Sequence, residues 1–365
     1  MSGLAAADPA RAAAFVALVN ARPMPDLIAG LTTRMSLFEI GDAAFPLTVN
    51  DRDEAGNCYI CRPSAAYIDY ALEEIRHFAR QPLLHRSMAG LIRACRPLMR
   101  ASGLDHQVQI NNWLFSTNPV PALGAAEAAL LRDRLCADHP GRALVIRSLN
   151  DVADGESMAA LRGAGFQLLP ARRIWLYDGR CPQRSRDIKR DEALLRDGLF
   201  QTVTEFSPQD YHAAAELYGQ LYLQKYTPLN PQYQGLFLSE MHRAGLLDLI
   251  ALRSPKGALV AVTGLFESGQ TLTQPVVGYD TSRPEAEGLY RRMMALSRQR
   301  AERAARFFNM SAGAAGFKKN RRAQPVIEYT AVFTGHLPAR QRQATALIAG
   351  VLTRLGIPLL QRFDL

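Results

Sequence analysis

Residues 271–291 read TLTQPVVGYDTSRPEAEGLYR, and the rest of the chain is interpreted from this stretch. The apolar run Thr271–Tyr279 predicts a β-strand, and Gly288 introduces a helix that we expect to extend to about residue 305. A strand therefore passes through a polar loop directly into a helix. The first backbone amides of a helix lack partners within it, and the helix dipole favours anions there. The stretch predicts a site for an anion such as a pyrophosphate.

On either side of this stretch, the expected elements form a mixed pattern. Strands are predicted at 247–252 and 258–266, separated by the turn signals Pro255-Lys-Gly257 and Ser268-Gly269, which is typical of a meander of hairpins. Helices are predicted at 207–226 and 232–244, the first opened by Ser207-Pro208. After the helix that follows Gly288, we expect strands at 307–311 and 326–333 and a last helix at 338–355.

The first half of the chain repeats this order of elements without repeating the sequence. Helices are expected at 9–19, 65–78, 84–99, 122–136 and 156–162, and strands at 107–115, at 143–147 and in a stretch ending at Tyr177. The basic segment 181–190 is interpreted as a boundary. The expected fold class is α+β with a mixed sheet, in two similar domains of mostly antiparallel twisted sheet flanked by helices. The predicted ranges are an N-terminal helix at 1–30 and domains at 31–182 and 183–365.

The excess positive charge of the chain is concentrated in one segment. The 365 residues hold 43 Lys and Arg against 34 Asp and Glu, a formal net charge of +9. Residues 283–343 contain 13 of the basic residues and only four acids, so this segment carries the whole excess. Only five of these 43 residues are Lys and the rest are Arg. A GC-rich genome would produce the same preference for Arg over Lys. A local field of this kind favours an anionic partner, with a solvated helix face as the alternative.

Several classes of protein are excluded or not expected. With 48% hydrophobic and 21% charged residues, the chain is globular and not disordered or fibrous. No run of 18 apolar residues predicts a membrane span, and the N-terminus does not resemble a signal peptide, so a cytoplasmic location is expected. Five cysteines argue against a disulfide framework, and Cys58 and Cys61 form an isolated CxxC. The seven histidines show no metal spacing, and no metal is expected.

The stretch 278–291, followed by FNMSAGAAGFK at 308–318 and PVIEY at 325–329, resembles the GNAT superfamily of acyl-CoA N-acyltransferases in tandem duplicate. The most similar subtype is the Fem-like and acetyltransferase-6 branch. The resemblance covers most of residues 199–335 at the level of motifs and residues 30–180 only in architecture. It implies a catalytic second domain and a non-catalytic first domain.

The resemblance implies an acyl-CoA or acyl-pantetheine co-substrate. The strand before the loop should diverge from its neighbour, so that the pantetheine arm adds as a further strand. The residues implied in donor binding are Val276, Val277, Gly278, Tyr279, Arg283, Gly288, Leu289, Tyr290, Arg291 and Arg292. The loop keeps one glycine of the family pattern Gln/Arg-x-x-Gly-x-Gly/Ala. It also contains Glu285 and Glu287, which would repel a phosphate.

Forming an amide from a thioester requires a deprotonated amine, a polarised carbonyl and a proton for the leaving thiolate. Lys318 stands where simple GNAT enzymes carry the tyrosine that protonates the thiolate. Glu328 and Asp280 are the candidate bases, with Glu328 expected on a strand beside the one that ends at Tyr279. The acceptor is expected to contact Tyr226, Asn230, Tyr233 and Tyr329. Each of these residues also has an ordinary structural interpretation.

The leading hypothesis is an N-acyltransferase that uses acyl-CoA or an acidic acyl carrier protein and a small amine such as an amino acid. One alternative is a Fem-type transferase that draws its group from aminoacyl-tRNA. Another is a catalytically silent protein that binds an acyl ligand. Nucleic acid is not expected as a partner, and a steep dependence of binding on salt would argue otherwise.

Overall fold

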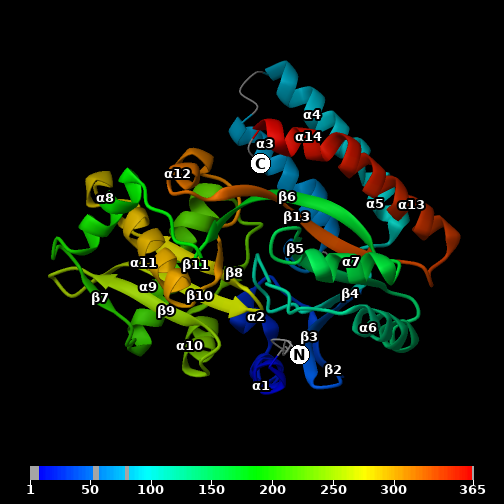
Figure 1. Cartoon of the computed structure of the whole chain (residues 1–365), viewed down its shortest axis with the longest axis horizontal. Helices are drawn as coiled ribbons and strands as arrows, with labels where there is room; N and C mark the ends of the chain where they lie inside the picture. Colours follow the sequence, from blue (N-terminus) through cyan, green and yellow to red (C-terminus); the bar gives the residue numbers. More distant parts are fainter. Residues whose placement is uncertain (1–7, 52–56, 79–81, 364–365) are drawn as a thin grey trace. The chain divides into compact units, whose positions relative to one another are not determined.

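The computed structural model describes residues 8–51, 57–78 and 82–363, and the chain divides into two compact units (Figure 1). Unit 1 comprises Met1–Val16, Gly30–Arg173 and Ile327–Leu365, and unit 2 comprises Ala17–Ala29 and Ile174–Val326. These units differ from the predicted ranges 31–182 and 183–365. The difference arises because the last strand, β13 (Gln324–Phe333), pairs with β5 of unit 1 through Glu328–Phe333.

Unit 1 contains a sheet that is mostly antiparallel. Strands β2 (Arg34–Ile40), β3 (Ala43–Asn50) and β4 (Gln107–Ile110) pair in this order with antiparallel neighbours. The next pair, β4 and β5 (Ala143–Asn150), is parallel, and β5 then pairs antiparallel with β13. The first part of β6 (Gln167–Asp178) follows β13 in the strand order. The predicted strand 107–115 therefore ends at Ile110, because Asn111 has a positive φ of 58° and begins a turn.

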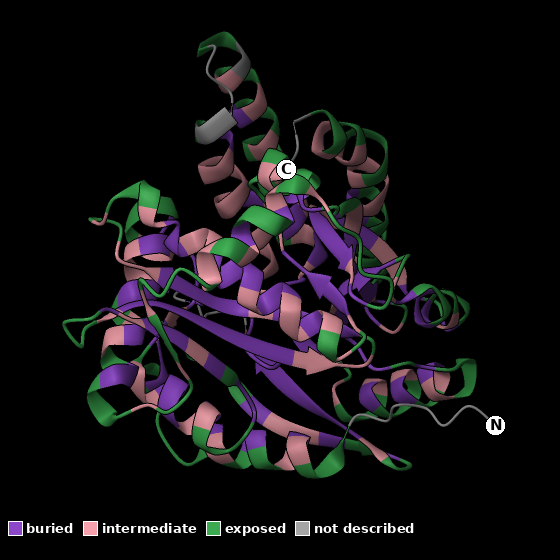
Figure 2. Ribbon diagram, turned by 60° about the vertical axis from the view of Figure 1, so that its left-hand side comes forward, coloured by how far each residue is buried: buried purple, intermediate pink, exposed green. Residues whose placement is uncertain are grey.

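Helices cover both faces of this sheet (Figures 1 and 2). On one face, α6 (Ala125–Asp138) and α7 (Gly155–Gly163) pack on Leu144, Ile146 and Ala331. Over the other face lie two sets of helices, which pack on Val145 and Val332. The first set consists of η1 (Ala65–Tyr70), α3 (Ala71–Phe78), α4 (Pro82–Ala94) and α5 (Arg96–Ser102), and the second of α13 (Ala339–Val351), η4 (Leu352–Gly356) and α14 (Ile357–Phe363). Helix α1 (Pro9–Asn20) begins in unit 1.

The C-terminal helices α13, η4 and α14 form a helical stretch of 24 residues, Ala339–Arg362. By length and composition alone this stretch is apolar enough to cross a membrane, whereas the sequence led us to expect no span. Ala344, Thr345 and Ile348 of this stretch are buried, and Ile348 belongs to the core cluster over the sheet. One face of this helical stretch therefore packs in the core of unit 1. The cytoplasmic location stays a prediction.

Unit 2 is built on the predicted meander. Strands β7 (Gln201–Val203), β9 (Asp248–Arg253), β10 (Leu259–Ser268) and β11 (Thr271–Tyr279) pair antiparallel in the order given. Strand β11 then pairs parallel with β12 (Phe307–Asn309), which pairs antiparallel with the end of β6. A second, two-stranded sheet joins β1 (Ile28–Ala29) and β8 (Gln232–Tyr233). With one parallel pair in each unit, the predicted class of mixed, mostly antiparallel sheet flanked by helices is confirmed.

The sequence did not predict every helix of unit 2. Helix α8 (Arg186–Leu195) occupies the expected boundary segment, and α12 (Ala315–Asn320) follows β12. The other helices are α2 (Met24–Leu27), α9 (Pro208–Gly219), η2 (Gln220–Tyr226), α10 (Gly235–Arg243), η3 (Glu285–Glu287) and α11 (Leu289–Arg303). Helix α9 begins as predicted at Ser207-Pro208, because Ser207 Oγ accepts from the amide of Asp210 in a capping box.

Candidate functional site

Strand β11, the predicted donor strand, diverges from one of its two neighbouring strands, as expected. Strand β11 pairs with β12 only from Thr271 to Thr273, whereas its pairing with β10 continues to Tyr279. The backbone of Val276 and Val277 therefore pairs with β10 on one side and no longer pairs with β12 on the other. The β-carbon of a larger residue at Gly278 would meet the backbone of α9, so this glycine allows the helix to pack on the strand.

The loop after β11 is held by its own side chains. Asp280 accepts hydrogen bonds from the amide and the hydroxyl of Ser282, at 3.0 Å and 2.6 Å, and so closes a turn. Arg283 forms a bidentate ion pair with Glu287, with N–O distances of 2.6 Å and 2.9 Å. Gly288, at φ 63°, ends η3 and precedes Leu289, the first residue of α11. The guanidinium of Arg283, which was predicted to bind the donor, is therefore already paired with Glu287 of the same loop.

The side chain of Arg292 also bonds to other groups of the protein. Its side chain is buried and donates to the backbone carbonyls of Glu287 and Leu194 and to the carboxylate of Asp197. The loop 283–288 and the end of α8 are thereby tied to α11. We assign Arg292 to folding of unit 2, although donor binding was predicted from the sequence.

Arg291 and Arg321 form a different arrangement, because they share a single carboxylate. Asp191 of α8 accepts from Arg291 Nε at 2.7 Å and from Arg321 Nε and Nη2 at 2.5 Å and 3.0 Å. Both arginines line an open hollow of about 490 Å³ on unit 2, together with Asp187, Arg190, Ala193 and Leu194. With three guanidinium groups against the carboxylates of Asp187 and Asp191, this hollow, the arginine hollow, keeps a positive charge.

Three tyrosines lie near one another where β11 ends and α11 begins. The rings of Tyr279 and Tyr290 are 6.2 Å apart, and Tyr290 also contacts Phe317 at 5.0 Å. Burial raises the pKa of Tyr290, and the neighbouring Tyr226 and Tyr279 raise it further, while Arg321 lowers it. A phenol with a raised pKa stays protonated at neutral pH and releases its proton less readily than an ordinary tyrosine.

Lys318, the predicted acid, is buried in α12. Its ammonium donates to the carbonyls of Ser311 and Ala312, at 3.0 Å and 2.8 Å. These two carbonyls belong to the turn that leaves β12, and Ser311 has a positive φ of 61°. The lysine therefore holds this turn, and its role as an acid stays a prediction.

The predicted acceptor residues of unit 2 do not converge on one space. The side-chain amide of Asn230 is buried and donates to the carbonyls of Tyr222 and Thr227, so it closes the turn after η2. Tyr233 is buried in β8 and stacks on Phe237 at 5.1 Å. Tyr226 is 50% exposed. Tyr226 alone of these three remains available to a small acceptor.

Glu328 and Tyr329 belong to unit 1, and the expected position of Glu328 beside β11 is wrong. Strand β13 pairs with β5, where Glu328 lies opposite Asn150 and Tyr329 opposite Leu149. Glu328 is buried, and its carboxylate accepts from Arg172 Nε at 2.8 Å and Nη2 at 3.3 Å. Arg172 Nη2 also donates to Thr117 Oγ1. Glu328 is thus the partner of a buried arginine within unit 1.

Two further carboxyls of unit 1 hold their protons more tightly than usual. Burial raises the pKa of Glu74 to about 7, although Arg172 lowers it. Burial also raises the pKa of Asp154 to about 7, against the lowering effect of a hydrogen bond from the backbone of Asn150. Above the ordinary values of 4.5 and 3.8, the folded protein keeps protons that the unfolded chain has lost. These two groups therefore make the free energy of unfolding fall as the pH rises towards about 7.

We expect this effect to be visible in the variant Glu74→Gln. Glutamine resembles the protonated acid, so the variant should match the wild-type protein near pH 4.5 and become progressively more stable than it up to about pH 7. Above that pH, the difference in free energy of unfolding should stay constant. Urea unfolding at a series of pH values measures it, and a difference that does not change with pH would contradict the assignment.

In the isolated CxxC, Cys61 is buried and Cys58 is half-buried, and both thiols have raised pKa values. Burial raises the pKa of Cys58 to about 11 and raises that of Cys61 further. A thiol that stays protonated is a poor nucleophile and metal ligand. Over residues 8–51, 57–78 and 82–363, no group of three or more His, Cys, Asp or Glu side chains is placed to hold a metal ion.

No family model matches the chain, and a search of curated proteins finds no significant match. Among solved structures, it is similar to L-PGS from Bacillus licheniformis, with 14% identity over 67% of this chain and 83% of that one and a TM-score of 0.46. FemX is 9% identical over 56% of this chain and 76% of its own, with a TM-score of 0.44.

A tandem GNAT protein from the clavulanic acid biosynthesis pathway is 12% identical over 64% of this chain and 76% of its own, with a TM-score of 0.34. With TM-scores below 0.5 and identities between 9% and 14%, these matches assign no activity, donor or residue role to this chain.

Proposed function

We propose that the chain is an N-acyltransferase that moves an acyl group from a pantetheine thioester to a small amine by direct transfer. The observation that carries the proposal is the divergence of β11 from β12 after Thr273, followed at once by the loop into α11. An extended arm containing amide groups can add to such a backbone as a further strand. The pantetheine arm of coenzyme A or of an acyl carrier protein has this chemistry.

The arginine hollow supports a phosphate-bearing donor. Arg291 lies in the first turn of α11, where the backbone amides lack helical partners and the helix dipole favours anions. Arg291 and Arg321 share Asp191, so they retain positive charge that a phosphate would balance. The same charge would attract an acidic carrier protein.

The reaction can be assigned to groups near the end of β11. The amine nitrogen attacks the thioester carbon, the C–S bond breaks, the nitrogen loses a proton and the thiolate gains one. Tyr290 is the proposed donor of the proton to sulfur, because it lies in the first turn of α11 with its ring 6.2 Å from that of Tyr279 at the end of β11. Asp280 is the proposed acceptor of the proton from the amine, since it lies directly after Tyr279. Lys318 holds the neighbouring turn, and Glu328 is not assigned a step.

The release of free thiol from acyl-CoA or acyl carrier protein in the presence of an amine panel tests the proposal. Arg291→Ala is expected to raise KM for the thioester about tenfold, equivalent to about 1.4 kcal/mol. Arg300→Ala is the matched control: it lies on the same helix, is 37% exposed against 38% for Arg291, and pairs with Asp248 instead. Tyr290→Phe is expected to lower kcat about a hundredfold with little change in KM.

The alternatives give different results in the same assay. Transfer from aminoacyl-tRNA with no release from either thioester would overturn the proposal in favour of the Fem-type reaction. Saturable binding of an acyl thioester without turnover for any amine would favour a silent ligand-binding protein. Equal effects of Arg291→Ala and Arg300→Ala on KM would remove the arginine hollow from donor binding.

A further inference from the structure

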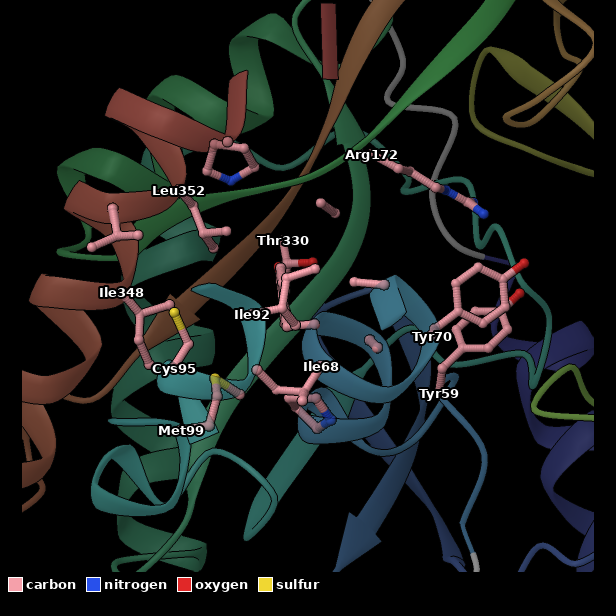
Figure 3. A pocket seen from close by; sticks show the side chains of 18 of the residues that line it. Tyr59, Ile68, Tyr70, Ile92, Cys95, Met99, Arg172, Thr330, Ile348 and Leu352 are labelled. Atoms are coloured by element: carbon pink, nitrogen blue, oxygen red, sulfur yellow. The ribbon is translucent and has the colours of Figure 1, made fainter. Parts of the chain in front are cut away.

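Unit 1 contains a cavity of about 260 Å³ that the proposed transfer does not use (Figure 3). All its lining residues belong to unit 1, and none was assigned above to donor or acceptor binding. One wall is the face of the sheet formed by β4, β5, β13 and β6. The opposite walls are η1, α3, α4, α5 and the C-terminal helices. The cavity is therefore enclosed between a sheet and a layer of helices.

One end of the cavity is apolar. Figure 3 shows Met99, Ile348 and Leu352 grouped there, together with Cys95 and Ile68. Two further lining residues, Leu91 of α4 and Leu355 of η4, are 48% and 49% exposed. These exposed leucines place the opening of the cavity between α4 and the C-terminal helices and give it an apolar rim. Such walls suit an alkyl chain and leave nucleotides and sugars without polar partners.

The sheet wall carries two buried amide atoms that lack partners. Gln107 and Gln109 alternate along β4, line the cavity and are each only 1% exposed. Gln107 Nε2 donates to the carbonyl of Cys61 at 2.8 Å, which fixes the orientation of this amide. In the described part of the chain, Gln107 Oε1 and Gln109 Nε2 have no hydrogen-bond partner. Because buried polar atoms are nearly always bonded, an acceptor and a donor are left for a ligand to satisfy.

Charged groups of both signs line the cavity, namely Arg147, Arg172, Glu74 and Glu328. Figure 3 shows Arg172 beside Tyr59 and Tyr70, and the rings of these two tyrosines are 4.9 Å apart. Arg172 is balanced by Glu328. Arg147 donates to the carbonyls of Ile60 and Ser116, at 2.9 Å and 3.1 Å, and over the described ranges no carboxylate pairs with it. The polar end thus offers a guanidinium that can donate hydrogen bonds to an anionic oxygen.

We propose that this cavity binds a fatty acid, with the alkyl chain against the helices and the carboxyl group at Gln107, Gln109 and Arg147. A carboxyl group accepts hydrogen bonds from the amide of Gln109 and from a guanidinium, and in its protonated form it also donates to Gln107 Oε1. The volume lies just below the usual range of about 300–1,000 Å³ for ligand pockets. It therefore fits one alkyl chain and not a two-chain lipid. This site is additional to the proposed transfer, and its tests measure binding and not turnover.

Calorimetric titration of the full-length chain with three amphiphiles of equal chain length tests the assignment. Decanoate is expected to bind once per chain and at least tenfold more tightly than decanol or decyltrimethylammonium. Equal affinity for all three, or tighter binding of the cation, would overturn the carboxyl group as the head. The absence of saturable binding by decanoate would overturn the site as a whole.

A cysteine in the wall provides a direct report of occupancy. Cys95 lines the apolar end, whereas Cys181 is exposed and belongs to unit 2. Saturating decanoate is expected to slow alkylation of Cys95 by N-ethylmaleimide at least fivefold, read from peptide masses, and to leave Cys181 unchanged. Binding without protection of Cys95 would place the ligand elsewhere and contradict the proposal.

Three variants test the carboxyl end and the alkyl end of the site separately. Gln109→Leu removes the unpaired donor at similar volume and should weaken decanoate about tenfold while leaving decanol within twofold. Ala66→Phe places a ring in the cavity and should abolish binding, whereas Ala94→Phe, at an exposed position of α4 outside the lining, should not change it. Retained binding in Ala66→Phe, or equal loss in Ala94→Phe, would overturn the location.

Discussion

Replacing Glu328 with glutamine is expected to lower the free energy of unfolding by about 3–5 kcal/mol. The carboxylate is 2% exposed and forms two hydrogen bonds with Arg172, whose Nη2 is also bonded to Ser116 and Thr117. Glutamine leaves the arginine in place and removes its counter-charge. A buried charge without a partner is among the most costly defects in a folded protein. Urea unfolding of the variant measures the loss.

A double-mutant cycle separates the pair from its surroundings. The double variant Arg172→Met, Glu328→Leu removes both charges at similar volume, so its stability should return close to that of the wild-type protein. Arg96→Met is the control, because it breaks the more exposed ion pair with Asp69 and should cost less than about 1 kcal/mol. A Glu328→Gln variant that unfolds like the wild-type protein and loses turnover would instead support the base predicted from the sequence.

The strand–loop–helix stretch that opened the interpretation was predictable because its signals are local. Strand β11 spans the predicted Thr271–Tyr279, and α11 begins at the predicted Leu289. A run of apolar and β-branched residues defines the strand, and Gly288 supplies the positive φ that separates η3 from α11. The hairpin turns before it follow from Pro, Gly and Ser in the same way. None of these features depends on a partner far away in the chain.

The division into units could not be predicted, because it depends on pairings between strands that lie far apart in the chain. Strand β13 lies about 180 residues after β5, and no local pattern in Gln324–Phe333 specifies that partner. Its transfer to unit 1 moves Glu328 and Tyr329 out of the predicted site. Helix α8 was missed for a related reason: its polar, basic sequence resembles a linker, and its helical face is defined by Arg291, Arg298 and Arg321, which bond its acids.

Binding of a donor by the predicted arginines stays a prediction, and the structure adds the partners of their side chains. The sequence located the basic segment, but it could not show which arginines are neutralised. Asp191 lies 130 residues before Arg321, and Asp197 lies 95 residues before Arg292. Of the arginines predicted to bind the donor, Arg291 shares the carboxylate of Asp191 with Arg321. The proposed fatty-acid cavity has a signal in the sequence. Residues 107–110 read Gln-Val-Gln-Ile, and all four are buried. Polar residues at every second position of a buried strand indicate that one face of the strand makes polar contacts.

Replacing Gly278 with alanine is expected to lower the free energy of unfolding by about 3 kcal/mol, the upper end of the range for overpacking a core. The new β-carbon would lie 2.4 Å from the carbonyl carbon of Leu217 and from the amide nitrogen of Tyr218. These are backbone atoms of α9, so no side chain can rotate to make room. The helix must move away from β11, and the packing between them must be lost. Urea unfolding of the variant measures the effect.

Gly219, the last residue of the same helix, provides a control with the opposite sign. It has helical dihedral angles, and the nearest atom to an added β-carbon is Leu223 Cδ1 at 3.8 Å. Gly219→Ala should therefore raise the free energy of unfolding by about 0.5–1 kcal/mol, because alanine loses less backbone entropy in a helix. The family resemblance implied Gly278 in donor binding. If that were its main role, Gly278→Ala would raise KM for the thioester and unfold like the wild-type protein. The crowding by α9 predicts a large loss of stability instead, since the space beside this glycine is already filled by the helix.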